Sequence, residues 1–469
     1  MTAPSVSFDT LSRHLREQEF FENKTWRLAP RAFPLRAQEK EQLEQIGQAC
    51  LEFLRAVENL YLKSVEKKSI LRNRSLVTPW VADYYDRGKP AAIIRRNRSR
   101  RAQGMMPPVF RPDLLLTEDG FALTEMDSVP GGIGLTAFLN RIFGEDDPSV
   151  IGREDAILDG WYEALRRHVP ERHSPLLAIV VSDEAATYRP EMEWLAERLR
   201  ERGKRVYCLH PEDLIPLGTG LCCAVEGNPE KIDLIYRFFE LYDLDHLPHA
   251  DFLLQAWEEG EVELYPPPKT FQEEKLSLAL FHHHLLEDYW RDHLSRSARR
   301  VLEAIIPRSW IVDPTPLPPN GVLDGPFVQG RPIHAWTDLT RASQRERSLI
   351  LKISGFHYSA EGARSVLLGS DCSRDEWAEG LEEAVTRADQ HPYIIQEYRK
   401  PMRRRHLLYH DGTLSREEEG RLRICPYYFL TDADTPKLSG VLCTFCPADK
   451  KIIHGMSDAA MLPARLDND

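Results

Sequence analysis

Apolar residues that recur every three or four positions mark the first long element of the chain. Between residues 38 and 68 this spacing predicts a helix with one buried face. A short apolar run at 91–94 predicts a strand, and the strongly basic stretch 95–101 (RRNRSRR) follows it. The positions that define the buried helix face are Leu43, Ile46, Cys50, Leu54, Val57, Leu60 and Tyr61.

The next pattern predicts a β-hairpin that leads into a helix. Residues 113–117 and 121–126 are two β-prone segments, and Glu-Asp-Gly at 118–120 forms the turn between them. The sequence Pro-Gly-Gly-Ile-Gly at 130–134 then predicts a second turn, followed by a helix over about 135–143.

From about residue 175 the pattern changes to that of a parallel α/β unit. The continuous apolar run 176–181 is typical of a strand that is covered on both faces. A helix is expected at 191–202 and further strands at 205–209 and 231–239. Since strand, helix and strand follow one another, residues 172–265 are expected to form a small Rossmann-like domain.

The last region, which begins after three consecutive prolines at 266–268, predicts a mixed fold. Helices are expected between 273 and 304, and a proline-rich loop at 314–326. Strands are expected at 349–353, 393–397, 422–430 and 440–445. The fold class is therefore α/β (α+β), with two or three domains for a chain of 469 residues.

Composition and charge exclude several classes of function. The 61 basic and 73 acidic residues give a net charge of −12, which argues against a general nucleic-acid or membrane-surface binder. The N-terminus has no apolar signal-peptide core, and no run of about 18 apolar residues predicts a membrane span. Eight cysteines are too few for a disulfide scaffold. A cytoplasmic protein is expected.

The acidic residues of the hairpin are the strongest candidates for a metal site. Asp113 and Glu125 lie opposite each other across the predicted turn, and Glu125 and Asp127 share one face of their strand. Three carboxylates on one face suit Mg²⁺, which binds carboxylate oxygens together with substrate phosphates. Arg111 should point to the same face, towards phosphate. The simpler alternative is a surface hairpin with scattered acids.

Further candidates for nucleotide binding lie in the last region. Lys352 ends a predicted strand, and a loop with Gly355 and Gly362 follows, in which backbone N–H groups can approach phosphate oxygens. Gln396 and Glu397 end another strand and are placed to meet an adenine ring. Each of these features is weak by itself, because a plain β-hairpin has similar residues.

The ordered set of motifs resembles the circularly permuted ATP-grasp ligases, and the glutathionylspermidine synthetase-like group in particular. The resemblance covers residues 90–445. The chain departs from the family pattern in its Asp127, where the family has Asn, and in its longer Lys352 loop without the following proline. The matching residues are Arg111, Asp113, Glu125, Lys275, Lys352, Gly355, Gly362, Gln396 and Glu397.

This resemblance implies an ATP-grasp fold with an inserted Rossmann-like pre-ATP-grasp domain. It implies four regions: a helical N-terminus at 1–88, a metal-site part at 89–171, the inserted domain at 172–265, and an ATP-binding part at 266–469.

The activity implied is ATP-dependent amide formation between a carboxylate and an amine, through an acyl phosphate, with two Mg²⁺ ions. Arg111 and Arg423 are expected at the transferred phosphoryl group, Lys275 and Lys352 at the ATP phosphates, and Pro130, Gly131 and Arg237 at the acceptor side. A non-catalytic relative that binds nucleotide or peptide, and a phosphotransferase, are the alternatives. The basic stretch 95–101 is expected to cover the active site. The substrates and the oligomeric state stay open.

Overall fold

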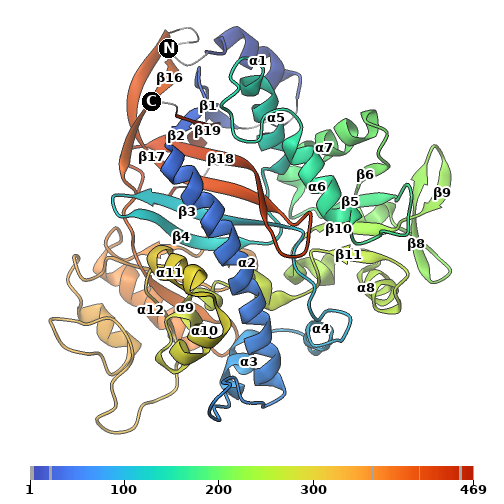
Figure 1. Cartoon of the computed structure of the whole chain (residues 1–469). Helices are drawn as coiled ribbons and strands as arrows, with labels where there is room; N and C mark the ends of the chain where they lie inside the picture. Colours follow the sequence, from blue (N-terminus) through green and yellow to red (C-terminus); the bar gives the residue numbers. More distant parts are fainter. Residues whose placement is uncertain are drawn as a thin grey trace.

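A computed structural model describes residues 5–18, 20, 24–360, 363–410, 412, 414–453 and 457–467. The chain folds into a large mostly antiparallel sheet, a parallel sheet and two smaller sheets, with helices packed around them (Figure 1). The helices are α1 (Phe8–Arg16), α2 (Ala37–Val65), α3 (Pro79–Asp86), α4 (Ala91–Asn97), α5 (Ile133–Gly144), α6 (Ala156–Arg166), α7 (Arg189–Glu201), α8 (Ala250–Glu259), α9 (Leu276–Phe281), α10 (Glu287–His293), α11 (Arg296–Ile305) and α12 (Arg374–Arg387).

The largest sheet has eight strands in the described part of the chain and joins segments that are far apart in sequence. The pairing of β3 with β4 confirms the predicted hairpin. The order is β1 (Thr25–Arg27), β19 (Ser457–Leu466), β18 (Lys437–Pro447), β17 (Leu414–Phe429), β3 (Val109–Thr117) and β4 (Gly120–Asp127), with β16 (Arg403–His410) paired to β17 and β2 (Phe33–Leu35) to β19.

Helix α2 crosses one face of this sheet (Figure 1) and confirms the predicted amphipathic helix. All the apolar positions that define its predicted face are buried, from Leu43 to Tyr61. They pack against side chains of β17 such as Ile424 and Tyr428. The Tyr428 ring lies so close to Gly47 that a Cβ there would be 2.4 Å from it, so only glycine fits. This contact fixes the helix on the sheet.

The second sheet is parallel throughout, in the order β11 (Glu263–Tyr265), β10 (Leu234–Phe238), β5 (Leu177–Val181) and β6 (Val206–Leu209). It confirms the predicted strand–helix–strand order, with α7 between β5 and β6. Every residue of β5 is buried, because alternate side chains enter different hydrophobic clusters on the two faces. The small sheet of β7 (Ile215–Leu217), β8 (Gly220–Val225) and β9 (Asn228–Lys231) adjoins it in sequence.

The third region holds an antiparallel sheet that is packed against α12. Its strands run in the order β12 (Ser309–Ile311), β15 (Tyr393–Glu397), β13 (Leu349–Ile353) and β14 (Leu367–Leu368). The helical prediction for 273–304 is confirmed as three short helices, α9, α10 and α11.

One predicted element is wrong. Residues 91–94 were expected as a strand but form the start of helix α4, which Pro90 precedes. A four-residue apolar run cannot distinguish a strand from a helix, and the burial of Ile93 and Asn97 on one side of α4 decides between them. Among the described residues, no helix is both long and apolar enough to cross a membrane.

Candidate active site

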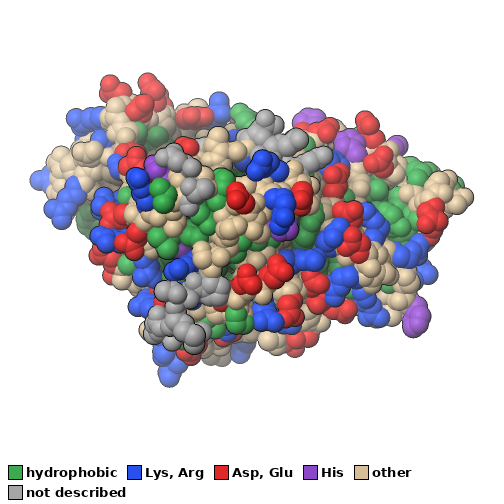
Figure 2. Space-filling model, turned by 90° about the horizontal axis from the view of Figure 1, so that it is seen from above, with side chains coloured by type: hydrophobic (Ala, Val, Ile, Leu, Met, Phe, Trp, Pro, Cys, Tyr) green, Lys and Arg blue, Asp and Glu red, His purple; other side chains and the backbone are tan. Residues whose placement is uncertain are grey.

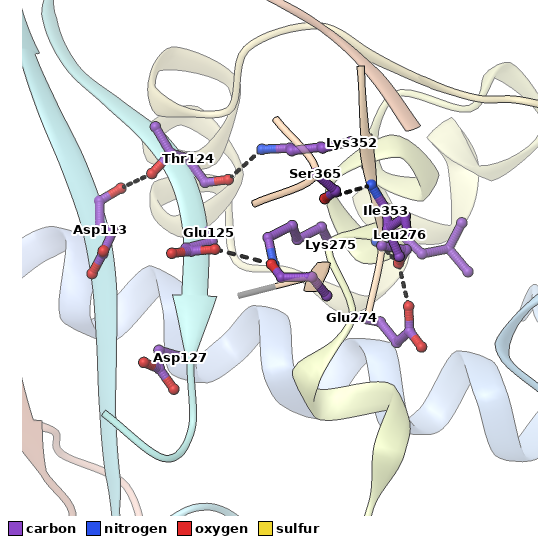
Figure 3. Close-up of polar contacts among 12 residues, drawn as sticks. Asp113, Thr124, Glu125, Asp127, Glu274, Lys275, Leu276, Lys352, Ile353 and Ser365 are labelled. Atoms are coloured by element: carbon purple, nitrogen blue, oxygen red, sulfur yellow. Dashed lines mark hydrogen bonds and ion pairs between the residues drawn. The ribbon is translucent and has the colours of Figure 1, made fainter. Parts of the chain in front are cut away.

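The β3–β4 hairpin brings the predicted acidic and basic residues together. In the register of the two strands, Arg111 lies opposite Asp127 and Asp113 lies opposite Glu125. Figure 3 shows the Glu125 and Asp127 side chains along one strand and Asp113 on the strand beside it. The predicted common face is therefore present.

Asp113 is fully buried and is held between two arginines. Its Oδ1 accepts a hydrogen bond from Arg111 Nε at 2.6 Å, and its Oδ2 lies 2.9 Å from Arg423 Nη1. Both oxygens are thus engaged, so Asp113 is not an open metal ligand in this structure. Among the described residues, no three His, Cys, Asp or Glu side chains converge closely enough to hold a metal ion. A magnesium site that includes Asp113 therefore stays a prediction.

Glu125 and Asp127 remain as the two carboxylates that reach open space, since their side chains are 35% and 29% exposed. Glu125 Oε2 lies 3.1 Å from Lys275 Nζ. Burial opposes ionisation of Glu125, but the charges of Lys275 and Lys352 outweigh it and lower its pKa. Glu125 is therefore ionised and ready to meet a cation.

Asp127 has the opposite electrostatic balance. Its Oδ2 lies 3.2 Å from Arg111 Nη2, and its Oδ1 accepts the Val129 N–H at 2.9 Å. Burial raises the pKa of Asp127 to about 6, and the nearby Asp113 and Glu125 charges add to the effect, while Arg111 opposes it. A divalent cation would relieve this repulsion.

Lys352 ties the third sheet to the hairpin. Its Nζ donates to the carbonyl of Thr124 at 2.8 Å and to Gln396 Oε1 at 3.0 Å. Thr124 has no partner in the register of β3 and β4, because a bulge interrupts the pairing there and leaves its carbonyl accessible. Burial, with the neighbouring Lys275, lowers the pKa of Lys352 to about 7.

Lys275 and the Gly355 loop lie beside this lysine. The Lys275 N–H donates to Ser354 O at 3.0 Å, and its Nζ donates to Ala360 O at 3.0 Å (Figure 3 shows Lys275 beside Glu125). At Gly355 an added Cβ would lie 2.8 Å from the carbonyl oxygen of Glu273, which explains the glycine. The predicted Gly362 lies outside the described residues.

The two residues that were predicted to contact adenine, Gln396 and Glu397, lie outside the cavity. Gln396 is buried, and it bridges Lys352 and the Ser309 hydroxyl, to which its Nε2 donates at 3.0 Å. Glu397 lies 3.3 Å from Arg399. Neither residue lines the cavity described next, so their contact with adenine stays a prediction.

A cavity of about 350 Å³ joins these residues. On the side of the antiparallel sheet it is lined by most of the predicted site. The predicted residues in its lining are Arg111, Glu125, Asp127, Gly131, Lys275, Lys352, Gly355 and Arg423. Lys24 and Trp26 from the N-terminal segment also line it, as do Tyr188, Glu191 and Glu240 from the region of the parallel sheet.

Of the three predicted acceptor-side residues, Gly131 lines the cavity, and Pro130 and Arg237 do not. The Gly131 carbonyl accepts hydrogen bonds from Arg111 Nη1 and from the Tyr427 hydroxyl, both at 2.7 Å, while Pro130 lies outside the lining. Arg237 is fully buried and outside the lining, and it pairs with Glu273. Its guanidinium therefore does not face a substrate directly.

Glu191 is a site residue that the sequence did not single out. Its carboxylate accepts the N–H groups of Gly132 at 2.7 Å and Leu135 at 2.8 Å at the start of α5. Burial raises its pKa to about 7, although these two hydrogen bonds oppose the shift. Its position at the start of the predicted helix 191–202 was the signal in the sequence that could have indicated its burial.

The expectation that residues 95–101 cover the active site is wrong. None of them lines the cavity. Arg96, Arg98 and Arg101 form ion pairs with acids of neighbouring elements, at Glu258, Asp86 and Glu263 respectively. Basic and acidic side chains are interspersed in the same way over the face seen in Figure 2.

The chain matches no protein-family model and no curated protein. Among solved structures, it is similar to a glutathione synthetase-like effector from Globodera pallida in its apo form, with a TM-score of 0.51, 11% identity and 97% of each chain covered. The two chains share a fold. A putative gamma-glutamylcysteine synthetase from Methylobacillus flagellatus KT matches with a TM-score of 0.43 and 13% identity over 81% of this chain and 86% of that one.

Proposed function

We propose that the protein is an ATP-dependent carboxylate–amine ligase, which forms an amide through an acyl phosphate and releases ADP and phosphate. One observation carries this proposal: the two carboxylates Glu125 and Asp127 share a cavity with four basic side chains from separate parts of the chain. The basic residues are Arg111, Arg423, Lys275 and Lys352. Such a mixture suits a nucleoside triphosphate with its metal ion, because phosphates need cations and the metal needs carboxylates.

We further propose the circularly permuted ATP-grasp arrangement, with 172–265 as the inserted domain between 89–171 and 266–469, after the region 1–88. Its support is that β3 and β4, which precede the insert, lie in one sheet with β17 and β18, which follow it. The fold shared with a glutathione synthetase-like effector is consistent with the same class of enzyme.

Glu125 and Asp127 would hold magnesium, for which two ions are expected. Their carboxylate oxygens fit a hard cation, and the pKa of Asp127 is raised mainly by burial, with the charges of Asp113 and Glu125 adding to the effect. Magnesium held by these two residues would supply positive charge against the negative charge that develops during transfer. Asp113 would act through Arg111 and Arg423, which it orients by accepting a hydrogen bond from Arg111 and by forming an ion pair with Arg423.

The basic residues divide into two groups by position. Lys275 and Lys352 lie beside Glu125 and the Gly355 loop, and we assign them to the ATP phosphates. Arg111 and Arg423 flank Asp113, and we assign them to the transferred phosphoryl group. Guanidinium groups can stabilise the three equatorial oxygens of that group in the transition state.

The proposal is tested by measuring ADP release with Mg·ATP and a panel of amino acids and small peptides as carboxylates, with amines added. Native protein should release ADP only when a carboxylate is present, and mass spectrometry should show an amide. Glu125→Gln with Asp127→Asn should abolish turnover. The control Asp119→Asn, an exposed acid in the turn of the same hairpin, should not.

A non-catalytic nucleotide-binding protein is the second candidate. Its support is that charged side chains of the site already have partners within the protein. Lys275 pairs with Glu125, and Lys352 donates a hydrogen bond to Gln396. Calorimetry that shows binding of Mg·ATP, with no ADP release over the whole panel, would favour this candidate. A stable phosphate ester in place of an amide would identify a phosphotransferase.

A further inference from the structure

A fully buried ion pair lies behind the residues that we assign to the ATP phosphates. Lys89, in the connection between α3 and α4, has its Nζ 2.6 Å from Oε1 of Glu274, and neither side chain is exposed to solvent. In Figure 3 the Lys275 side chain is directed towards Glu125, and the Glu274 side chain is directed away from it. Neither member of the pair lines the cavity, so the pair does not meet a ligand directly.

Glu274 connects this ion pair to two segments of the cavity wall. It directly precedes Lys275, and its Oε2 accepts a hydrogen bond from the Ser354 hydroxyl. The oxygen of the same hydroxyl accepts the Leu276 N–H at 2.7 Å, and the Ser354 carbonyl accepts the Lys275 N–H at 3.0 Å. The Glu274 carboxylate therefore joins the backbone that carries Lys275 to the residue at which the Gly355 loop begins.

The Gly355 loop passes directly over this ion pair. A Cβ at Gly355 would lie 3.1 Å from Glu274 Oε2. Phe356 has a φ of +47°, a left-handed conformation that is strained for an aromatic residue and needs support from its surroundings. The Lys89 ammonium lies 5.7 Å from the centre of its ring. Because Gly355 and Phe356 line the cavity, the ion pair supports a part of the wall that a ligand would touch.

The backbone that carries Lys89 is itself anchored, near the end of α12. Gly88 has a φ of +69°, and a Cβ there would overlap the carbonyl oxygen of Gln390, so only glycine fits. Arg87 Nη1 donates a hydrogen bond to the Ala388 carbonyl at 3.2 Å. These contacts fix the place from which the Lys89 side chain reaches the ion pair.

We propose that Lys89 is a positioning residue for the binding of Mg·ATP. Through Glu274 it holds Lys275 and the Gly355 loop in the arrangement that receives the phosphates. This inference rests on the proposed function, because it takes Lys275 and the loop as the phosphate-binding groups. Groups that are held in place before binding give a higher affinity, since less ordering is needed when the ligand arrives.

The test compares two buried lysines that form similar ion pairs. Lys269 Nζ lies 2.6 Å from Glu58 Oε1 of α2, and neither of these two residues lines the cavity. Lys89→Met and Lys269→Met each leave a buried carboxylate without its partner, so urea denaturation should show a loss of stability in both. Calorimetry with Mg·ATP, at a temperature at which both variants are folded, then measures the dissociation constant of each.

Lys89→Met should raise the dissociation constant for Mg·ATP by about tenfold or more, because the phosphate-binding groups lose their fixed positions. Lys269→Met should keep the native constant. Glu274→Gln should weaken binding as Lys89→Met does, and the double variant should be little weaker than either, as expected for two residues that act as one unit. If Lys89→Met does not fold, Ser354→Ala replaces it. This change leaves the ion pair intact, breaks its link to the loop and should also weaken binding.

Three outcomes bear on the positioning role and on the ligase separately. A native dissociation constant in folded Lys89→Met or in Ser354→Ala would overturn the positioning role, and so would an equal loss of affinity in Lys269→Met. Native protein that binds Mg·ATP but forms no amide would exclude the ligase without affecting the comparison of the two lysines. Native protein that does not bind Mg·ATP would overturn both.

Discussion

Two sheets meet at one cavity but contribute to it differently. One is the antiparallel sheet that contains β3, β4 and β17, and the other is the parallel sheet that contains β5 and β10. In the antiparallel sheet the functional side chains lie within the strands, on the face opposite α2. In the parallel sheet both faces of β5 are buried and none of its residues lines the cavity, so the charged lining residues on this side follow the strands. The first sheet therefore carries charge inside its strands, and the second carries it in its loops.

The difference predicts where a substitution affects chemistry and where it affects only folding. Charges within the strands of the antiparallel sheet are stabilised by pairing, as Asp113 is with Arg111 and Arg423. Breaking such a pair should cost stability and activity together. A substitution inside β5 should cost stability alone.

The largest expected effect is that of Asp113→Asn. The change removes the negative charge between two arginines, and a buried pair that loses one partner costs about 3–5 kcal/mol in the free energy of unfolding. Urea denaturation of the variant and of Asp119→Asn measures this cost, since Asp119 is exposed in the turn of the same hairpin. A loss below about 1 kcal/mol, as for an exposed ion pair, would contradict the assigned role of Asp113.

Glu125→Gln should separate chemistry from stability on the same sheet. Glu125 is partly exposed and faces the cavity, so the substitution should change the free energy of unfolding of the protein by less than about 1 kcal/mol. ADP release should fall by about 10²–10³-fold, in line with the loss of one group that stabilises the transition state. An active variant would exclude Glu125 from the metal site, and a loss of folding would make it a structural residue.

The sequence predicted the parts of this site that depend on local pattern. The alternation across residues 113–127 was enough to place Glu125 and Asp127 on one face, and the three-and-four spacing in 38–68 was enough to bury the right face of α2. Both depend on backbone geometry that short-range sequence determines.

The partners of each side chain could not be predicted in the same way. The ion pair between Asp113 and Arg423 depends on the pairing of β17 with β3, which are about three hundred residues apart in the chain. The hydrogen bond from Lys352 Nζ to the Thr124 carbonyl depends on a β-bulge, which the residue types in this segment do not predict. The approach of Glu184 and Asp243 to one cavity requires the ends of β5 and β10 to be neighbours in space.

Ile179→Ala tests the other half of the comparison. Ile179 is fully buried in the middle of β5, and its truncation should lower the free energy of unfolding by about 3 kcal/mol. The kcat for ADP release, measured per folded molecule, should stay at the native value because the side chain does not reach the cavity. Ile179→Val, which removes a smaller part of the same side chain, should lower the free energy of unfolding by about 1 kcal/mol. A fall in kcat without unfolding would show that the parallel sheet transmits strain to the site.

The smallest expected effect lies at the junction of the two sheets, where Glu191 of α7 accepts the N–H groups at the start of α5. Burial raises the pKa of Glu191 from 4.5 to about 7, so the folded state holds a proton that the unfolded state releases in this range. This contribution to stability is complete below about pH 4.5 and is lost as the pH rises to about 7.

The free energy of unfolding of native protein, relative to Glu191→Gln, should therefore fall between pH 5 and pH 7, by about 2 kcal/mol in total. The slope for one group is at most about 1.4 kcal/mol per pH unit. Urea titrations at the two pH values measure the difference. Parallel pH dependences would mean that the hydrogen bonds from Gly132 and Leu135 keep Glu191 ionised throughout. The contact between the two sheets would then be a charged cap on α5, which does not respond to pH in this range.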